Sequence, residues 1–232
     1  MKQGKPTLGI VTIGQAPRVD LHEDLFTLLG DNVNLLEMGA LDGLDLSTIQ
    51  HLYPVQHSDH VLVSRMQDGQ QVRIKESDLT PLLSEAVRRM QQQQPDLIIV
   101  LCTGDLPDFA NASGVVVISP KRVVHHFFAG LTDKLSIAVM SPDEAQVDNT
   151  RQRWLSQGFK VQCLAGSPYL EDGGRDDAAD QLKQMQADIV YLDCMGYTLE
   201  QKQQIAQRSG KSVITPREII FNTVKLLLNL RT

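Results

Sequence analysis

The chain has 232 residues, of which 42% are hydrophobic and 22% charged, a composition typical of a globular protein with one large domain or two small ones. Its formal net charge of −6 is opposite to the basic excess of most nucleic-acid-binding proteins, so we expect no nucleic-acid partner. The sequence contains no run of about 18 apolar residues that would predict a membrane span, and the polar stretch 1–6 lacks the apolar core of a signal peptide.

The number of cysteines indicates the cellular compartment in which the protein is expected to fold. Three cysteines, an odd number in a chain of this length, do not make a disulfide framework. Free thiols are typical of a reducing compartment, so we expect a cytoplasmic protein. The sequence is compatible with a homodimer.

The first forty residues follow the strand, loop, helix and strand pattern of a doubly wound α/β fold. An apolar strand is expected over 7–13, and it breaks at Gly14. A loop with Pro17 leads into an amphipathic helix that ends at Gly30, and a second strand follows over 33–38.

Residues 40–80 interrupt this pattern. Alternating side chains over 60–65 and 71–75 flank Asp68-Gly69, which predicts an antiparallel β-hairpin inserted into the first half. Before the hairpin, Ser47 is a candidate cap for a short helix, and after it Thr80-Pro81 is expected to open a helix over 79–90.

The rest of the chain returns to alternating strands and helices. Further strands are expected over 97–102, 115–118, 135–140, 159–164, 189–194 and 212–215. Helices are expected after 120, over 143–157, up to 185, over 199–208 and over 216–230.

The two halves of the chain resemble each other. Residues 8–11 correspond to 135–139, and the Ser-Pro stretch 117–122 corresponds to the Thr-Pro stretch 213–218. Cys102 and Cys194 fall at the same step of each half, at the end of a buried strand, where open α/β sheets bind their ligands. Two related lobes that face each other would bring both cysteines to one ligand.

Four motifs connect the chain to a known group of proteins. It resembles the aspartate/glutamate racemase superfamily and, within it, most closely the AroM family. The resemblance spans the whole chain and rests on TIGQAPR (12–18), CTGD (102–105), ISPKR (118–122) and CMGYT (194–198).

The resemblance implies that Cys102 and Cys194 are opposed catalytic thiols and that the loops beside them bind a substrate carboxylate. A thiol next to a helix N-terminus or a cation has a lowered pKa, so we expect a reactive thiolate near neutral pH. The residues expected to bind the substrate are Gly14, Gln15, Arg18, Thr103, Gly104, Gly196, Tyr197 and Thr198. The motifs depart from the superfamily pattern, because its Asn after the first cysteine is Thr103 here, and Met195-Gly196 stands where its Thr follows the second.

Simpler interpretations stand beside these. A buried cysteine often only packs, and Cys163, which has no counterpart in the other half, is expected to be structural. Asp105 and Asp193 flank the cysteines and either tune them or cap a turn. The histidine pairs 57/60 and 125/126 do not have the spacing of a metal site, and no phosphate-binding glycine motif is present, so we expect neither metal nor cofactor.

We therefore predict an α/β protein of two pseudo-symmetric, flavodoxin-like lobes with parallel sheets, a cleft between the lobes and an inserted hairpin in the first. The first lobe is expected to hold 1–120 and 216–232, and the second 121–215, with the returning C-terminal helix implied by the resemblance. The predicted function is that of a cofactor-independent racemase-, isomerase- or lyase-like enzyme acting on a small carboxylate. The alternative is a non-catalytic protein that binds a small acid in the same cleft.

Overall fold

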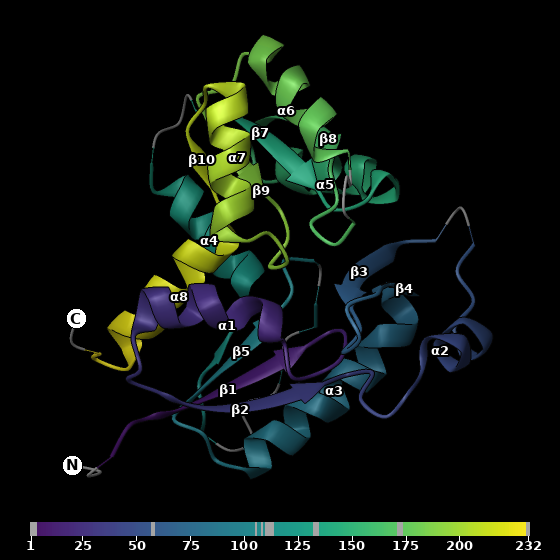
Figure 1. Cartoon of the computed structure of the whole chain (residues 1–232), viewed down its shortest axis with the longest axis vertical. Coiled ribbons are helices and arrows are strands. Elements are labelled where there is room, and N and C mark those ends of the chain that lie inside the picture. Colours follow the sequence, from purple (N-terminus) through teal and green to yellow (C-terminus); the bar gives the residue numbers. More distant parts are fainter. Residues whose placement is uncertain are drawn as a thin grey trace.

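Two four-stranded parallel sheets form the frame of the molecule, one in each lobe (Figure 1). This computed structural model describes residues 4–56, 59–104, 106–107, 109, 114–131, 135–170 and 174–230. The strands of the two sheets are β1 (Thr7–Thr12), β2 (Asn34–Gly39), β5 (Leu97–Leu101), β6 (Val117–Ile118), β7 (Ser136–Ser141), β8 (Lys160–Ala165), β9 (Ile189–Leu192) and β10 (Val213–Ile214).

The strand order shows the internal repeat directly. The first sheet runs β2-β1-β5-β6 and the second runs β8-β7-β9-β10, with every neighbouring pair parallel. Each strand of one sheet thus has a counterpart at the same place in the other. The predicted α/β class, with two lobes built on parallel sheets, is confirmed.

The central strands are apolar because helices cover both of their faces. All five residues of β5 are buried, as are five of the six in β7. A strand that is buried on both faces has no solvent-exposed face, so its apolar residues do not alternate with polar ones. This explains the continuous apolar runs in the sequence. The helices that cover the sheets are α1 (Val19–Leu29), α3 (Glu76–Gln92), α4 (Pro120–Ala129), α5 (Val147–Leu155), α6 (Arg175–Gln184), α7 (Leu199–Ser209) and α8 (Pro216–Leu227), and a 3₁₀ turn, Glu144–Gln146, precedes α5.

Helix α4, the last of the first sequence half, packs in the second lobe, and α8, the last of the second half, packs in the first lobe. Val124 and Phe128 of α4 join a core cluster with Trp154 and Tyr191 of the second lobe. Residues of α8, Phe221 among them, join the core of the first lobe, where α8 lies along α1 (Figure 1). This exchange supports the division into 1–120 plus 216–232 and 121–215, which stays a prediction.

The inserted hairpin is present, with β3 (Val61–Arg65) and β4 (Gln71–Lys75) paired antiparallel as predicted. It follows the short helix α2 (Leu46–Leu52) and leads directly into α3. The hairpin spans from the first lobe towards the second. Among the described residues, three pairs make polar contacts between them: Arg73 with Asp143 (2.9 Å), Gln146 Nε2 with the Val61 carbonyl (2.8 Å), and Ser167 with Gln71 (2.8 Å).

Two local predictions need correction. Ser47 does not cap α2, since it is the Asp45 carboxylate that accepts the hydrogen bond from the Thr48 backbone N–H at 2.7 Å. The helix α3 begins at Glu76 rather than near Thr80, because β4 runs straight into it and Pro81 is accommodated inside the helix.

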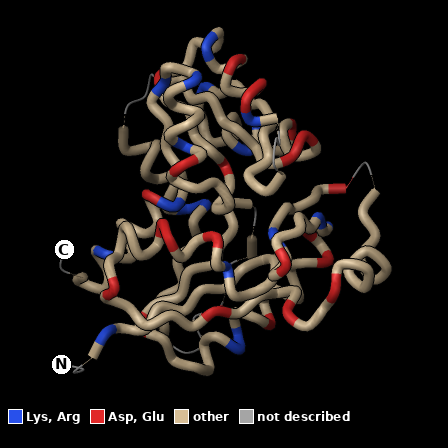
Figure 2. The backbone as a smooth tube through the Cα atoms, viewed as in Figure 1, with Lys and Arg blue, Asp and Glu red and all other residues tan. Residues whose placement is uncertain are grey.

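Charged residues of both signs are interspersed over both lobes (Figure 2). Within the described residues, no helix has both the length and the apolar character needed to span a membrane.

Candidate functional site

The two predicted cysteines occupy turns with matching hydrogen bonds at the ends of corresponding strands. Cys102 follows β5 and Cys194 lies two residues after β9, and the backbone N–H of each cysteine donates at 2.8 Å to the carbonyl two residues before it. In each turn the N–H of the glycine two residues later, Gly104 or Gly196, donates to the cysteine sulfur at 3.3 Å. The repeat therefore presents two thiols in the same local geometry from opposite lobes.

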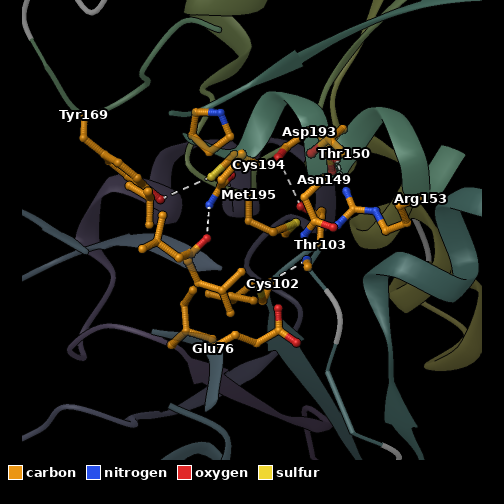
Figure 3. Close-up of a pocket in the computed structure, with 18 residues that line it drawn as sticks. Glu76, Cys102, Thr103, Asn149, Thr150, Arg153, Tyr169, Asp193, Cys194 and Met195 are labelled. Carbon is orange, nitrogen blue, oxygen red and sulfur yellow. Dashed lines mark hydrogen bonds and ion pairs between the residues drawn. The ribbon is translucent and has the colours of Figure 1, made fainter. Parts of the chain in front are cut away.

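Both thiols line one cavity between the lobes (Figure 3). A direct hydrogen bond joins the two cysteine turns, since the Thr103 hydroxyl donates to the Asp193 carbonyl at 3.1 Å. The residues that line the cavity are Ile13, Val61, Leu62, Val63, Glu76, Leu101, Cys102, Thr103, Gly104, Pro142, Gln146, Asn149, Thr150, Arg153, Tyr169, Asp193, Cys194 and Met195.

The cavity is closed by the hairpin. Leu62 and Val63 of β3 form part of its wall, and Leu62 lies so near Gly104 that a Cβ there would come within 2.7 Å of a Leu62 methyl carbon. The enclosed volume is about 30 Å³, which is room for water but not for an organic acid. An organic acid would fit only if the walls of the cavity moved apart.

Burial sets the protonation of both thiols in this closed state. Burial raises the pKa of Cys102 to about 12, although the Gly104 N–H opposes the shift. Burial also raises the pKa of Cys194, against the hydrogen bond from Tyr169, the Gly196 N–H and the positive charge of Arg18. The expectation of a thiolate near neutral pH thus does not hold for the closed cavity, because no helix start or cation outweighs the loss of water.

Arg18 lies behind the cavity rather than on its wall. Its guanidinium forms a two-point contact with Asp20 at 2.8 Å and donates to the Thr12 hydroxyl at 3.1 Å. It also stacks on the Tyr169 ring, 5.8 Å from the centroid, and Tyr169 in turn contacts the Cys194 sulfur at 3.5 Å. Arg18 is therefore occupied by Asp20, and it acts on Cys194 only through its charge.

Besides Gly196, four other predicted substrate-binding residues do not line the cavity either. Gly14 allows the hairpin to approach, since a Cβ there would lie 2.3 Å from the Arg65 carbonyl oxygen. Gln15 donates to the carbonyls of the 41–44 loop, and Tyr197, fully buried in the core, donates to the Gly166 carbonyl. Thr198 caps α7 in a capping box with Gln201.

Of the predicted set, the structure brings together Cys102, Cys194, Thr103 and Gly104 at the cavity, with Gly196 holding the second sulfur. Asp193 also lines it, whereas Asp105 and His57 lie outside the described residues. Cys163 is half-buried and is not part of the cavity wall. Over the portions of the chain that are described, no three His, Cys, Asp or Glu residues are grouped so that they could hold a metal ion.

Sequence reasoning missed the polar wall that the second lobe contributes. Gln146, Asn149, Thr150 and Arg153 recur at helical spacing on the predicted helix 143–157, and all four line the cavity. Such a polar stripe on a helix beside a sheet was a readable signal, since that face would ordinarily be apolar. Tyr169 and Glu76 carry no comparable signal, because a loop and a hairpin connection place them.

Comparison with solved structures gives the same fold at low sequence identity. The chain is similar to allantoin racemase from Klebsiella pneumoniae, with a TM-score of 0.58 and 14% identity over 97% of this chain and 88% of that one. It is similar to Nocardia farcinica maleate cis-trans isomerase (TM-score 0.63, 12% identity, 97% and 93% covered) and to glutamate racemase from Aquifex pyrophilus (0.57, 16%, 95% and 83%). At these identities the likeness shows the fold alone.

Comparison with curated protein sequences gives no match. A family model does match: that of the AroM protein family, over residues 8–228, which includes both cysteine turns and both lobes. The chain therefore belongs to the AroM family, as its four motifs predicted.

Proposed function

We propose that this protein is a cofactor-independent racemase-, isomerase- or lyase-like enzyme that acts on a small carboxylate, with Cys102 and Cys194 as opposed thiols. The observation that carries the proposal is the pair of cysteine turns with matching hydrogen bonds, from opposite lobes, at one shared cavity. A site that removes a proton from one face of a carbon and returns one to the other face needs two such groups.

The chemistry needs one thiolate and one thiol. The thiolate takes the proton from the carbon beside the carboxylate, which leaves a carbanion, and the neutral thiol opposite delivers its own proton to that carbon. Cys194 is the better candidate for the thiolate, because Tyr169, the Gly196 N–H and the charge of Arg18 all lower its pKa. Cys102 would then be the acid.

The solved structures with a similar fold support a racemase- or isomerase-like reaction. Their names describe racemisation of allantoin and glutamate and cis-trans isomerisation of maleate. The substrate is not carried over with the fold, because a shared fold hosts different chemistries in different sites.

The proposal is tested by exchange of substrate C–H hydrogen with deuterated solvent, followed by NMR. The panel contains glutamate and maleate, taken from the neighbours' names, together with alanine and 2-phenylpropionate, which have one carboxylate each. We expect exchange or isomerisation of at least one acid, and loss of it in Cys102→Ser and in Cys194→Ser separately. Cys163→Ser is the matched control and should keep full activity. Activity that survives in the Cys102→Ser/Cys194→Ser double variant would overturn the proposal.

A second candidate is a protein that binds a small acid without turning it over. The closed cavity and the raised pKa of both thiols favour this alternative. A thermal-shift screen with the same acids separates the two functions, since stabilisation by an acid that shows neither exchange nor isomerisation identifies a binding protein.

Location and assembly are proposals as well. The three free cysteines support the reducing cytoplasm, which cell fractionation tests. A homodimer is tested by sedimentation of the full chain.

A further inference from the structure

Arg153 is a buried cation with spare hydrogen-bond donors at the cavity. Its side chain is nine-tenths buried, at 10% exposure, and its Nη2 forms an ion pair with Asp193, whose side chain is 4% exposed. Its Nε is buried and has no hydrogen-bond partner. A guanidinium presents its donors in a planar fork that matches a carboxylate, so a buried one with an unused donor is suited to bind one.

The groups beside Arg153 on α5 are also available. Asn149 and Thr150 share its face of the helix and line the same cavity (Figure 3). Within the part of the chain that the structure describes, neither the Asn149 amide nor the Thr150 hydroxyl makes a hydrogen bond. This face therefore presents a charged fork flanked by two neutral hydrogen-bonding groups.

The rest of the cavity lining is different in kind. Ile13, Leu62, Val63, Leu101 and Met195 make it largely apolar. Its charged member is Glu76, a half-buried carboxyl whose pKa is raised by burial. Lys121 lies outside the cavity wall, where its charge acts on Glu76.

We propose that Arg153 binds the carboxylate of the substrate at this site, and that the cavity takes acids with a single carboxylate in preference to dicarboxylates. The inference rests on the proposed function only in assigning the ligand to the same cavity. Among the described lining residues, Arg153 is the one cation, set against the carboxylates of Asp193 and Glu76. One substrate carboxylate would balance the guanidinium, whereas a second would meet Glu76 or the apolar wall without a cation to pair with.

Asp193 has a different part in this arrangement. Its carboxylate holds Arg153, its carbonyl accepts from Thr103, and Cys194 follows it directly in the chain. It is therefore a positioning residue, which fixes the guanidinium relative to both cysteine turns.

The test is calorimetric titration of the full-length protein with butyrate and with succinate, which have the same chain length but one and two carboxylates. We expect butyrate to bind at least about tenfold more tightly than succinate. Arg153→Gln should weaken butyrate binding by about 10- to 100-fold, since a hydrogen bond to a charged group is lost. Arg151→Gln is the matched control, because Arg151 is on the same helix but pairs with exposed Asp148. Its binding should equal that of the wild type.

Three results would overturn the inference: unchanged butyrate binding in Arg153→Gln, succinate bound as tightly as butyrate, or no butyrate binding by the wild type. If Arg153→Gln does not fold because Asp193 is left unpaired, Arg153→Gln/Asp193→Asn removes both charges together, and melting curves confirm the fold. Binding should be lost there too.

The two proposals fail independently. Cys102→Ser and Cys194→Ser should lose exchange but keep butyrate binding. Binding that depends on Arg153 in a protein without any exchange would refute the reaction and leave this inference standing. Exchange with an unchanged KM in Arg153→Gln would refute this inference and leave the reaction standing.

Discussion

At the scale of single residues, the cavity holds its thiols neutral, and this has a measurable consequence for stability. In the folded protein the pKa of Cys102 is raised from its usual 9.0 to about 12 by burial. The raised pKa therefore contributes its full stabilisation below pH 9, where the thiol is neutral in both the folded and the unfolded chain. This contribution is lost as the pH rises from 9 towards 12, because the unfolded chain then releases the proton more readily. At pH 10 the loss from Cys102 is about 1.4 kcal/mol.

The measurement is urea unfolding at pH 8 and pH 10 for the wild type and Cys102→Ser. Serine does not ionise in this range, and other groups titrate alike in both proteins. The wild type should lose about 1.4 kcal/mol more than the variant between the two pH values. Equal losses would show that the Cys102 thiol is not shielded from water.

Residue chemistry was only partly readable from the sequence. The repeat singled out Cys102 and Cys194 because both end a buried strand, and their immediate neighbours Thr103 and Gly104 came with them. Arg18 was chosen as the anchor because it follows a strand end, but Asp20 holds its guanidinium. Which of several arginines keeps an unused hydrogen-bond donor at the cavity depends on partners that only the fold brings near.

At the scale of elements, the hairpin decides how large the cavity is. Leu62 of β3 is 7% exposed and packs on the Cys102 turn. We expect Leu62→Ala to lower the free energy of unfolding by about 2 to 5 kcal/mol, because it removes buried methyl groups and leaves a void. The same void should admit reagents, so alkylation of Cys102 should be faster than in the wild type.

The control for this prediction is Leu52→Ala, since Leu52 of α2 is 54% exposed. Its unfolding free energy should stay within about 0.5 kcal/mol of the wild type. Both quantities come from urea titration and mass-spectrometric alkylation. Should Leu62→Ala and Leu52→Ala give equal alkylation rates, the hairpin would not be what shields the thiol.

The hairpin itself was predictable, because Asp68-Gly69 between alternating strands is a strong local signal. Its position over the cavity was not, since it depends on contacts such as Arg73 with Asp143 that join residues 70 apart in the chain. The start of α3 was missed for a related reason. A proline normally indicates a helix start, and here the hairpin connection sets the start five residues earlier, at Glu76.

At the scale of the whole molecule, the repeat explains how two lobes share one site. The sequence repeat predicted two matching sheets, and the strand orders agree with it. Comparison of the two sequence halves did not reveal that α4 packs with the second lobe and α8 with the first, because an apolar helix face fits either core. The C-terminal helix was placed by resemblance alone.

One buried arginine connects this exchanged helix to the site. Arg217 of α8 is fully buried, and its Nη1 pairs with Asp24 of α1 at 2.5 Å. Its other donors reach the carbonyls of Met195 at 2.8 Å and Gly196 at 2.9 Å, in the second cysteine turn. Helix α8 thereby ties the Cys194 turn to the first lobe.

We expect Arg217→Met to lower the free energy of unfolding by about 3 to 5 kcal/mol, since the Asp24 carboxylate and the carbonyls of Asp20, Met195 and Gly196 would lose their buried partner. Arg208→Met is the matched control, because Arg208 also has two carboxylate partners, Asp176 and Asp180, but is 41% exposed. Its loss should be a small fraction of that of Arg217→Met, because exposed ion pairs contribute little. Urea unfolding measures both. Similar losses in the two variants would mean that burial does not set the strength of the Arg217 contacts.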